Sequence, residues 1–434
     1  MLTRSSSVSD TVSPAGAAAI PLSAVEHLFL EYLRPSEHLQ IGGLLRLTGP
    51  PPDLADVREV VLARLPAWPN LSSVVSDTRP PCWVPATTID LADQVREWLC
   101  APGTELRAAV EQIMALPLAR NRPLWELWIV HGAEIDEWTA VLKAHHTVVD
   151  GTSIIRLGQH LLSAAGPSAP VSATTATRPA VERARRWSLV RGSMRYLGRL
   201  LPLARSPFIP CAETGDRRFA WACVDRELMH SIAHHHGVTV NDVFLAAFAG
   251  ALRAWPDTPW RHGRPQPVWT LVPVDLRPRS GEHANGNSVA NLRIRLPCAE
   301  PDPLRRLAGI AASTHSAASA DHVAVSGAAQ RSFPKWLILA MARLLFSGSH
   351  ISIVASNMPG LEEPATFAGG VGSEFIALGP LIPGHRLGAF LVSSHDQFSI
   401  SVVTDDSLPD GRGLADLWVR AVLELAALRT ESGG

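Results

Sequence analysis

The spacing of apolar and polar residues predicts a succession of strands and helices. Trp138 to Leu142 is apolar and β-branched, as expected of a buried strand, and Ile154 to Leu162 has the spacing of a helix. Leu39 to Leu47 predicts another strand, and Leu54 to Leu65 predicts an amphipathic helix. A junction from strand through loop to helix is therefore expected between residues 142 and 154.

The start of the chain is predicted to hold a leader and then a helix. Residues 1–20 are rich in Ser, Ala and small polar residues, which is typical of a disordered leader. Pro21-Leu22-Ser23 predicts a helix start with Ser23 as its N-cap, and Leu28, Phe29 and Tyr32 would form the apolar face.

Similar patterns continue to the C-terminus. Ala115 to Val130 predicts a proline-led core strand, while His234-His235-His236 predicts a solvated loop. The other predicted elements are a helix at Val238 to Leu252, an apolar helix at Trp336 to Phe346, a strand at Ile351 to Val354 with a turn after it, two strands in Leu387 to Val403, and a closing helix at Gly413 to Leu428.

The length of 434 residues predicts two domains. Residues 166–179 form a Ser/Ala/Thr/Pro tract that cannot bury much apolar surface, so we place the boundary there. The expected division is an N-terminal domain at 21–165, a crossover linker at 166–210, and a C-terminal domain at 211–434. Within the linker, Arg183 to Arg205 reads equally well as a basic amphipathic helix on an anionic membrane or as a connecting helix packed on the protein.

Composition excludes several classes of function. The formal net charge of -1, with 46% hydrophobic residues, gives no general attraction to nucleic acid. The five cysteines are scattered and lack metal-ligand spacing, so no metal site and a reduced, cytoplasmic environment are expected. Nowhere do about 18 apolar residues follow one another, so any contact with the inner membrane or a lipid inclusion would be peripheral.

Candidate chemistry lies at the predicted junction. His145 and His146 are adjacent, and Asp150-Gly151 follows after three residues. A neutral imidazole held at one nitrogen can use the other as a base near pH 7, which suits removal of a proton from a hydroxyl group. Gly151 would allow a close approach that a side chain would block.

The pattern HHxxxDG resembles the signature of acyl-CoA-dependent acyltransferases with the chloramphenicol acetyltransferase fold. Four further blocks resemble the bacterial wax ester synthase/diacylglycerol acyltransferase branch. They are Pro123-Leu124-Trp125, Asn241-Asp242, Val272 to Arg277, and Ser356-Asn357-Met358-Pro359-Gly360. Without the resemblance, these four blocks would be interpreted, in the same order, as part of a core strand, a helix cap, a strand and a turn. The sequence departs from the family at Glu26 and Ala119, where Asp is usual.

The resemblance implies an α/β fold of two chloramphenicol acetyltransferase-like domains with a substrate channel between them. It implies that His146 is the general base, that His145 shapes the site, and that Asp150 pairs with an arginine, for which Arg277 is our candidate. The implied substrates are acyl-CoA, as co-substrate and without a further cofactor, and diacylglycerol or a long-chain fatty alcohol. No GxSxG elbow is present, so an acyl-enzyme is not required.

Three alternatives stay open. A condensation-like acyltransferase would use the same histidine with a carrier-bound acyl group. A chloramphenicol-type acetyltransferase would act on small soluble acceptors without preferring long acyl chains. An inactive lipid-binding paralogue is the alternative from a different class, and the intact HHxxxDG counts against it.

Overall fold

The computed structural model describes residues 11–12, 19–31, 33–34, 37–134, 136–162, 214–256, 268–275, 289–317, 339–340, 351–361, 363–382 and 384–431. The expected leader, the linker at 166–210 with its basic segment, the helix at Trp336 to Phe346 and the candidate Arg277 lie wholly or largely outside these residues.

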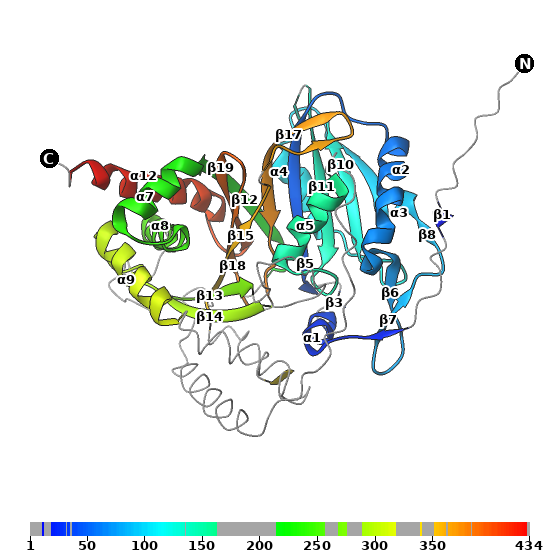
Figure 1. The fold of residues 1–434 in the computed structure, drawn as a ribbon, viewed down its shortest axis with the longest axis horizontal. Coiled ribbons are helices and arrows are strands. Elements are labelled where there is room, and N and C mark those ends of the chain that lie inside the picture. Colours follow the sequence, from blue (N-terminus) through cyan, green and yellow to red (C-terminus); the bar gives the residue numbers. More distant parts are fainter. Residues whose placement is uncertain are drawn as a thin grey trace, which may run out of the picture.

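Two six-stranded sheets lie side by side, the first on the right and the second on the left of Figure 1. The first has the order β16 (Thr366–Phe367), β17 (Gly370–Leu378), β5 (Gln40–Thr48), β11 (Glu137–His145), β10 (Trp125–His131) and β9 (Val95–Leu99). The second has the order β12 (Arg217–Asp225), β19 (Gln397–Asp405), β18 (Leu387–Ser393), β15 (Ile353–Pro359), β13 (Val268–Asp275) and β14 (Val289–Leu296).

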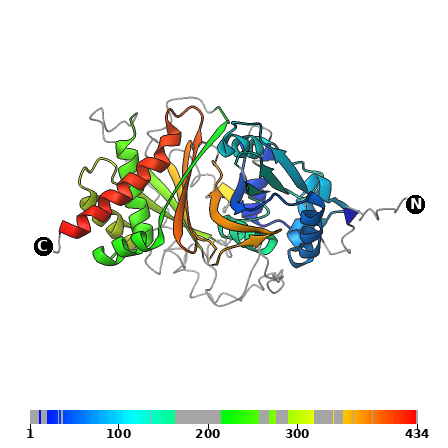
Figure 2. The ribbon, with the colours of Figure 1, turned by 90° about the horizontal axis from the view of Figure 1, so that it is seen from above.

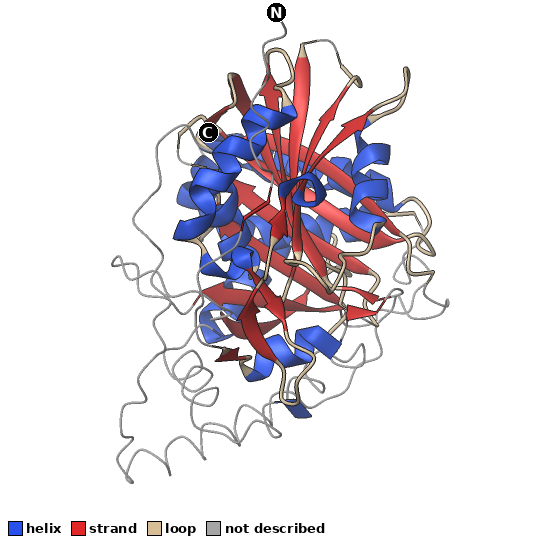
Figure 3. Ribbon diagram, turned by 90° about the vertical axis from the view of Figure 1, so that its right-hand side faces the viewer, coloured by secondary structure: helices blue, strands red, loops and turns tan. Residues whose placement is uncertain are grey.

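Helices and short strands complete the two halves (Figure 3). The N-terminal half has α1 (Ala24–Glu31), α2 (Leu54–Arg64), α3 (Leu91–Gln94), α4 (Leu106–Ala115), α5 (Gly151–Leu162) and the 3₁₀ helices η1 (Leu65–Ala67) and η2 (Pro69–Ser72). The C-terminal half has α7 (Arg226–His236), α8 (Val240–Ala254), α9 (Pro303–Ala317), η4 (Gly411–Gly413) and α12 (Leu414–Glu431). Small sheets join β2 (Ile20–Pro21), β7 (Cys82–Pro85) and β6 (Ser73–Val75), then β1 (Thr11–Val12) with β8 (Ile89–Asp90), and β3 (Leu33–Arg34) with β4 (Glu37–His38).

The first sheet is covered on both faces. Successive residues of a strand point to opposite faces. A Cβ on Gly42 would lie 3.4 Å from the sulfur of Met114 on α4, whereas a Cβ on Gly43 would lie 2.7 Å from the ring of Phe375. Phe375 also contacts α5, since a Cβ on Gly158 would lie 3.5 Å from its ring. Helices α4 and α5 therefore pack on opposite faces of β5.

The second sheet separates the two hydrophobic cores. On β18, Ala389 and Leu391 belong to the core formed with α7, α8, α9 and α12, while Phe390 and Val392 belong to the core of the N-terminal half. This alternation is the period of two expected of a strand buried on both faces. Figure 2 shows these helices on the outer side of the sheet and the N-terminal half on its other side.

A strand pair from the C-terminal half completes the first sheet. Strands β16 and β17 lie within residues 366–378, and β17 pairs antiparallel with β5, with Phe375 opposite Leu45. The division drawn from the sequence assigned these residues to the domain at 211–434. In the structure they extend the sheet of the N-terminal half, so the C-terminal half contributes two strands to the first sheet.

Most predicted elements are confirmed, and two predictions are wrong. His234-His235-His236 forms the last turn of α7, which ends at Gly237 with a φ of 63°. Histidines near a helix C-terminus suit the negative end of the helix dipole, which a loop prediction ignores. Ser356 and Asn357 lie inside β15, paired with Phe390 and Leu391, and not in a turn.

The first helix begins as predicted. Ser23 Oγ accepts a hydrogen bond from the Glu26 main-chain N–H at 3.2 Å, and the Glu26 carboxylate accepts one from the Ser23 N–H at 2.6 Å. Glu26 thus closes a capping box. Of the helices in the described ranges, none reaches by itself the length and hydropathy needed to span a bilayer, although α7 and α8 together do, across a bend of 99°.

Candidate active site

The histidine pair lies where β11 ends and is held on both sides by neighbouring strands. The His145 main-chain N–H donates to the carbonyl of Leu124 at 2.9 Å, and the His146 N–H donates to the carbonyl of Leu39 at 3.0 Å. The chain then turns, with the Val148 N–H bonded to the His145 carbonyl at 2.8 Å, and enters α5 at Gly151. The predicted strand–loop–helix junction is confirmed.

His146 is the accessible member of the pair. Every residue from Trp138 to Asp150 is buried except His146, which keeps part of its surface exposed. Phe29 of α1 packs against its ring, with the ring centroids 4.5 Å apart. An imidazole on a rigid strand end, shielded on one side and open on another, is suited to meet a substrate.

His145 is held in place and kept neutral. It is 1% exposed, and its Nδ1 accepts a hydrogen bond from the Thr147 main-chain N–H at 3.2 Å, with Thr147 Oγ1 at 2.7 Å. The neutral ring therefore carries its hydrogen on Nε2. Burial, with smaller contributions from the charges of His146 and Arg120, lowers the pKa of His145 from 6.5 to about 3. These contacts fit the predicted role of His145 in shaping the site.

The low pKa of His145 predicts acid destabilisation. Between pH 6.5 and about 3 the unfolded chain binds a proton at this position that the folded chain does not, so stability falls as the pH falls through this window. From pH 6.5 to 5 the loss is about 2 kcal/mol. His145→Gln, which does not titrate, should give a shallower decline in urea unfolding at pH 7, 6 and 5. Parallel declines in the two proteins would contradict this.

Asp150 begins helix α5 and acts on His146 through its charge. Its Oδ1 accepts a hydrogen bond from the Ser153 N–H at 2.8 Å, and its carbonyl accepts one from the Ile154 N–H at 2.9 Å. Burial lowers the pKa of His146, while a hydrogen bond to its own main-chain carbonyl and the Asp150 charge oppose this lowering. Asp150 is 1% exposed. Its hydrogen bonds to Ser153 and Ile154 fix the loop that carries His146 to the start of α5. Its predicted partner, Arg277, lies outside the described residues, so that ion pair stays a prediction.

Gly151 brings the second sheet against this loop. A Cβ at Gly151 would lie 2.9 Å from the sulfur of Met358, which is on β15. Further along α5, Gln159 Nε2 donates to the carbonyl of Gly360 at 3.2 Å. The HHxxxDG and SNMPG blocks, about 200 residues apart in sequence, are therefore in contact. Within the described residues, Ser356 and Asn357 pair with Phe390 and Leu391 of β18 rather than with the histidines.

The PLW block supports the histidine strand. The Leu124 carbonyl holds His145, as described, and Trp125 pairs with Ala144 in the sheet. The Trp125 Nε1–H donates to the Leu71 carbonyl at 2.8 Å, and Gln94 Nε2 donates to the Pro123 carbonyl at 3.2 Å. These contacts agree with the structural role preferred from the sequence.

The Asn241-Asp242 pair lies in the first turn of α8, and the cap itself is Thr239. Asp242 at the third helical position accepts from the Thr239 N–H at 2.9 Å, while Thr239 Oγ1 accepts from the Asp242 N–H at 3.1 Å. Thr314 of α9 donates its hydroxyl to Asp242 Oδ1 at 2.6 Å. The pair thus opens the helix as expected, and the hydrogen bond of Asp242 with Thr314 joins α8 to α9.

Sequence reasoning missed a buried ionic group beside the site. Lys143, two residues before His145, is 0% exposed, and its Nζ lies 3.3 Å from Glu126. Burial lowers the pKa of Lys143 to about 8 although the Glu126 charge opposes this. Nζ also donates to the carbonyls of Ile113 at 2.9 Å and Leu116 at 2.6 Å. One signal was available, because Lys143 is one of two lysines in the chain and interrupts an apolar strand.

Comparison with known proteins identifies the family. The wax ester synthase/diacylglycerol acyltransferase catalytic domain matches residues 22–205, and the C-terminal domain of that family matches residues 285–426. Among the described residues, no three His, Cys, Asp or Glu side chains are grouped so that they could hold a metal ion.

Relatives extend over most of the chain. A Mycobacterium tuberculosis H37Rv protein named "Putative diacyglycerol O-acyltransferase" is 30% identical over 396 residues, covering 81% of this chain and 82% of the relative. The wax ester synthase/diacylglycerol acyltransferase of Marinobacter aquaeolei VT8 has a TM-score of 0.68 at 22% identity, covering 94% of this chain and 100% of that one. The first condensation domain of the calcium-dependent antibiotic synthetase also has a TM-score of 0.68, at 20% identity, covering 96% and 98%. The chain therefore belongs to the wax ester synthase/diacylglycerol acyltransferase family.

Proposed function

We propose that this protein transfers a long-chain acyl group from acyl-CoA to the hydroxyl of diacylglycerol or of a long-chain alcohol, with His146 as the general base. The observation that carries the proposal is the exposure of His146 alone within the buried run from Trp138 to Asp150. Family membership supports the reaction class, and the fold shared with condensation domains supports a site between two halves.

The reaction follows from the position of one imidazole. His146 takes the proton of the acceptor hydroxyl while the oxygen attacks the thioester carbonyl, so that a C–O bond forms. The C–S bond then breaks, and the imidazolium gives its proton to the CoA thiolate. General-base catalysis of this kind contributes about 10²–10⁴-fold. His145, with its pKa near 3, stays neutral and orients the loop.

A cavity beside the site supports long-chain substrates. It has a volume of about 490 Å³ and runs along α5 from Thr152, the residue after Gly151, to Leu162. Its walls are mixed: Leu45, Ile155 and Phe375 are apolar, whereas Arg156, Gln159 and Glu363 are polar or charged. The volume is within the range of cavities that bury small organic ligands, and the apolar part of the wall would suit a hydrocarbon chain.

The cavity gives a test of chain-length selectivity. In Gly158→Leu a side chain would project toward Phe375 and fill part of the cavity. Each buried methylene of the acyl chain contributes about 0.8 kcal/mol. Excluding several methylenes from the cavity should therefore lower kcat/KM for a C16 substrate about tenfold relative to a C8 substrate. Gly309→Leu, at an exposed helical glycine of α9, is the matched control. An unchanged chain-length profile in Gly158→Leu would remove the cavity from the proposal.

One assay tests the proposed reaction. The purified protein would be offered radiolabelled palmitoyl-CoA with diacylglycerol or hexadecanol, and the products separated by thin-layer chromatography. Labelled triacylglycerol or wax ester is expected. A condensation-type activity is the second candidate, because the condensation domain matches the fold equally well. It would instead give product with acylated carrier protein and none with palmitoyl-CoA.

Both substrates suggest where the protein works. An enzyme that uses acyl-CoA and water-insoluble acceptors would act in the cytoplasm, with peripheral contact at the inner membrane or at lipid inclusions. Fractionation of cells after carbonate washing would separate a peripheral protein from an integral one.

A further inference from the structure

Helix α4 makes polar contacts in two places, one with the C-terminal half and one with the strands that carry the histidines. Its middle holds Glu111, and its C-terminal end presents the carbonyls of Ile113 and Leu116. No role in the proposed reaction has been assigned to this helix.

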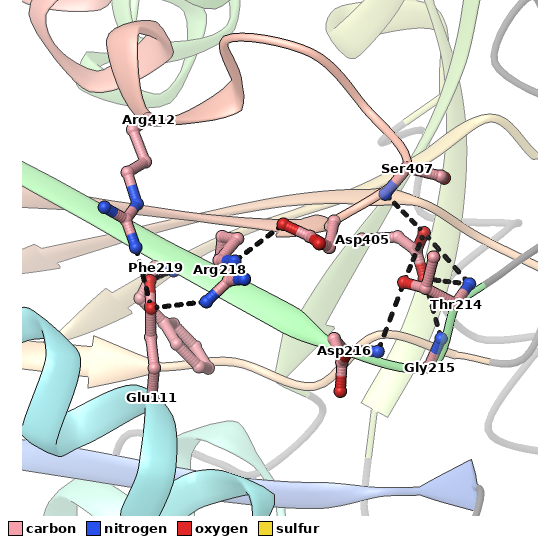
Figure 4. Close-up of polar contacts among 10 residues, drawn as sticks. Glu111, Thr214, Gly215, Asp216, Arg218, Phe219, Asp405, Ser407 and Arg412 are labelled. Atoms are coloured by element: carbon pink, nitrogen blue, oxygen red, sulfur yellow. Dashed lines mark hydrogen bonds and ion pairs between the residues drawn. The ribbon is translucent and has the colours of Figure 1, made fainter.

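Glu111 joins α4 to the C-terminal half (Figure 4). Its Oε2 accepts hydrogen bonds from Arg412 of η4 at 2.8 Å and from Arg218 of β12 at 3.1 Å, and its Oε1 accepts one from the Phe219 main-chain N–H at 3.0 Å. Arg218 is held in turn by Asp406 at 2.7 Å. The Glu111 side chain is only 6% exposed, so this carboxylate is compensated by charged donors rather than by water.

The end of α4 joins the histidine strands. The Leu116 carbonyl accepts from Lys143 Nζ at 2.6 Å and from Gln40 Nε2 at 3.0 Å. Lys143 is on β11, and Gln40 pairs with His145 in the sheet. Lys143 is therefore two residues before His145, and Gln40 is directly opposite it. Four helical residues, 112–115, lie between Glu111 and the shared acceptor Leu116.

We infer that α4 fixes the position of the histidine strand relative to the C-terminal half, and that Glu111 is the positioning residue that anchors it. A helix is rigid over this length, so its two sets of contacts set the distance between the parts they hold. The inference rests on the proposed function, in which the acceptor hydroxyl must meet both His146 and the thioester. A displacement of about 1 Å in such an arrangement can cost about 10²-fold in rate.

A shift of the histidine strand relative to the C-terminal half should favour hydrolysis of the thioester over transfer to the alcohol. Water can replace the alcohol: its proton goes to His146, its oxygen attacks the thioester, and the C–S bond breaks to give a free acid and CoA thiol. A water molecule can attack from any free position near His146, whereas the alcohol must be aligned with both His146 and the thioester. A loss of folded protein would lower both products equally, so the ratio of ester to free acid reports positioning.

The test compares Glu111→Gln with Glu424→Gln. Glu424 of α12 pairs with the buried Arg306 of α9 at 2.9 Å, entirely within the C-terminal half, and so is the matched control. Ester and free fatty acid from palmitoyl-CoA are measured below the Tm of each variant, and hydrogen exchange is measured on the amides of residues 137–150. We expect Glu111→Gln to lower the ester-to-acid ratio at least tenfold and to speed exchange in this segment, with Glu424→Gln at wild-type values.

The outcomes separate the two hypotheses. A wild-type ratio and wild-type exchange in Glu111→Gln would overturn the inference, as would equal changes in Glu424→Gln. If the wild-type protein forms no ester at all, the proposed function fails, and the exchange measurement alone decides whether Glu111 anchors β11. Faster exchange only in Glu111→Gln would then still support the positional role.

Discussion

His146→Ala is expected to lower kcat/KM for acyl transfer by about 10²–10⁴-fold or more while the protein stays folded. His146 follows directly after β11 and keeps part of its surface exposed, and it would both accept the hydroxyl proton and return a proton to the leaving thiolate. His145 cannot substitute, because its pKa near 3 makes it a very weak base. Initial rates with palmitoyl-CoA and diacylglycerol would measure the loss.

His131→Ala provides the matched control for this experiment. His131 is at the far end of β10, where its Nε2 lies 2.7 Å from Glu97, and it belongs to the same sheet as His146. Its replacement should leave kcat/KM unchanged. Turnover near the wild-type rate in a folded His146→Ala protein would reject the base assignment. Because burial lowers the pKa of His146 below 6.5, the wild-type activity should fall only on the acid side of that value.

Lys143→Met should destabilise the protein by roughly 1–3 kcal/mol, since it removes a buried hydrogen-bond donor and one of the partners of the buried Glu126. Glu126 is 1% exposed and would keep Arg122 at 3.1 Å as a partner, and the Leu116 carbonyl would keep Gln40 at 3.0 Å. The carbonyls of Ile113 and Leu116 would both lose the Lys143 donor. The free energy of unfolding in urea at pH 7 measures the effect. The double variant with Glu126→Gln should recover part of the loss, and a single variant as stable as wild type would refute the argument.

The difference in unfolding free energy between wild type and Lys143→Met should depend on pH. The pKa of Lys143 is about 8 in the folded protein and 10.5 in the unfolded chain. Between these values the unfolded chain binds a proton that the folded chain does not, so stability rises with pH across the window. The gap between wild type and Lys143→Met should therefore widen from pH 8 to 10.

The sequence was sufficient to predict the local elements around the site. Ser23 caps α1 as expected, β11 and α5 flank the histidines, and Gly151 admits a close contact. These features depend on neighbours in the chain, through capping, hydrophobic period and the small size of glycine. Local rules can therefore place the elements that carry the two histidines.

Features that depend on distant residues were not predictable in this way. The turn expected at Ser356 is a strand, because β18 pairs with it and overrides the turn propensity of Asn and Gly. Glu111 reads as an ordinary helical glutamate, and its two arginine partners are more than 100 residues away. The covariation of Glu111 with Arg218 and Arg412 among relatives would be the signal to look for.

The strand β17 also constrains how the chain can be made. The edge of β5 that faces β17 stays without its partner until residue 378 of 434 has been synthesised, so the first sheet cannot close on the ribosome as an early unit. A fragment ending near residue 165 would carry that open edge permanently and would tend to associate through it. A split version of this protein should accordingly assemble when the two halves are co-expressed, and not when either half is expressed alone.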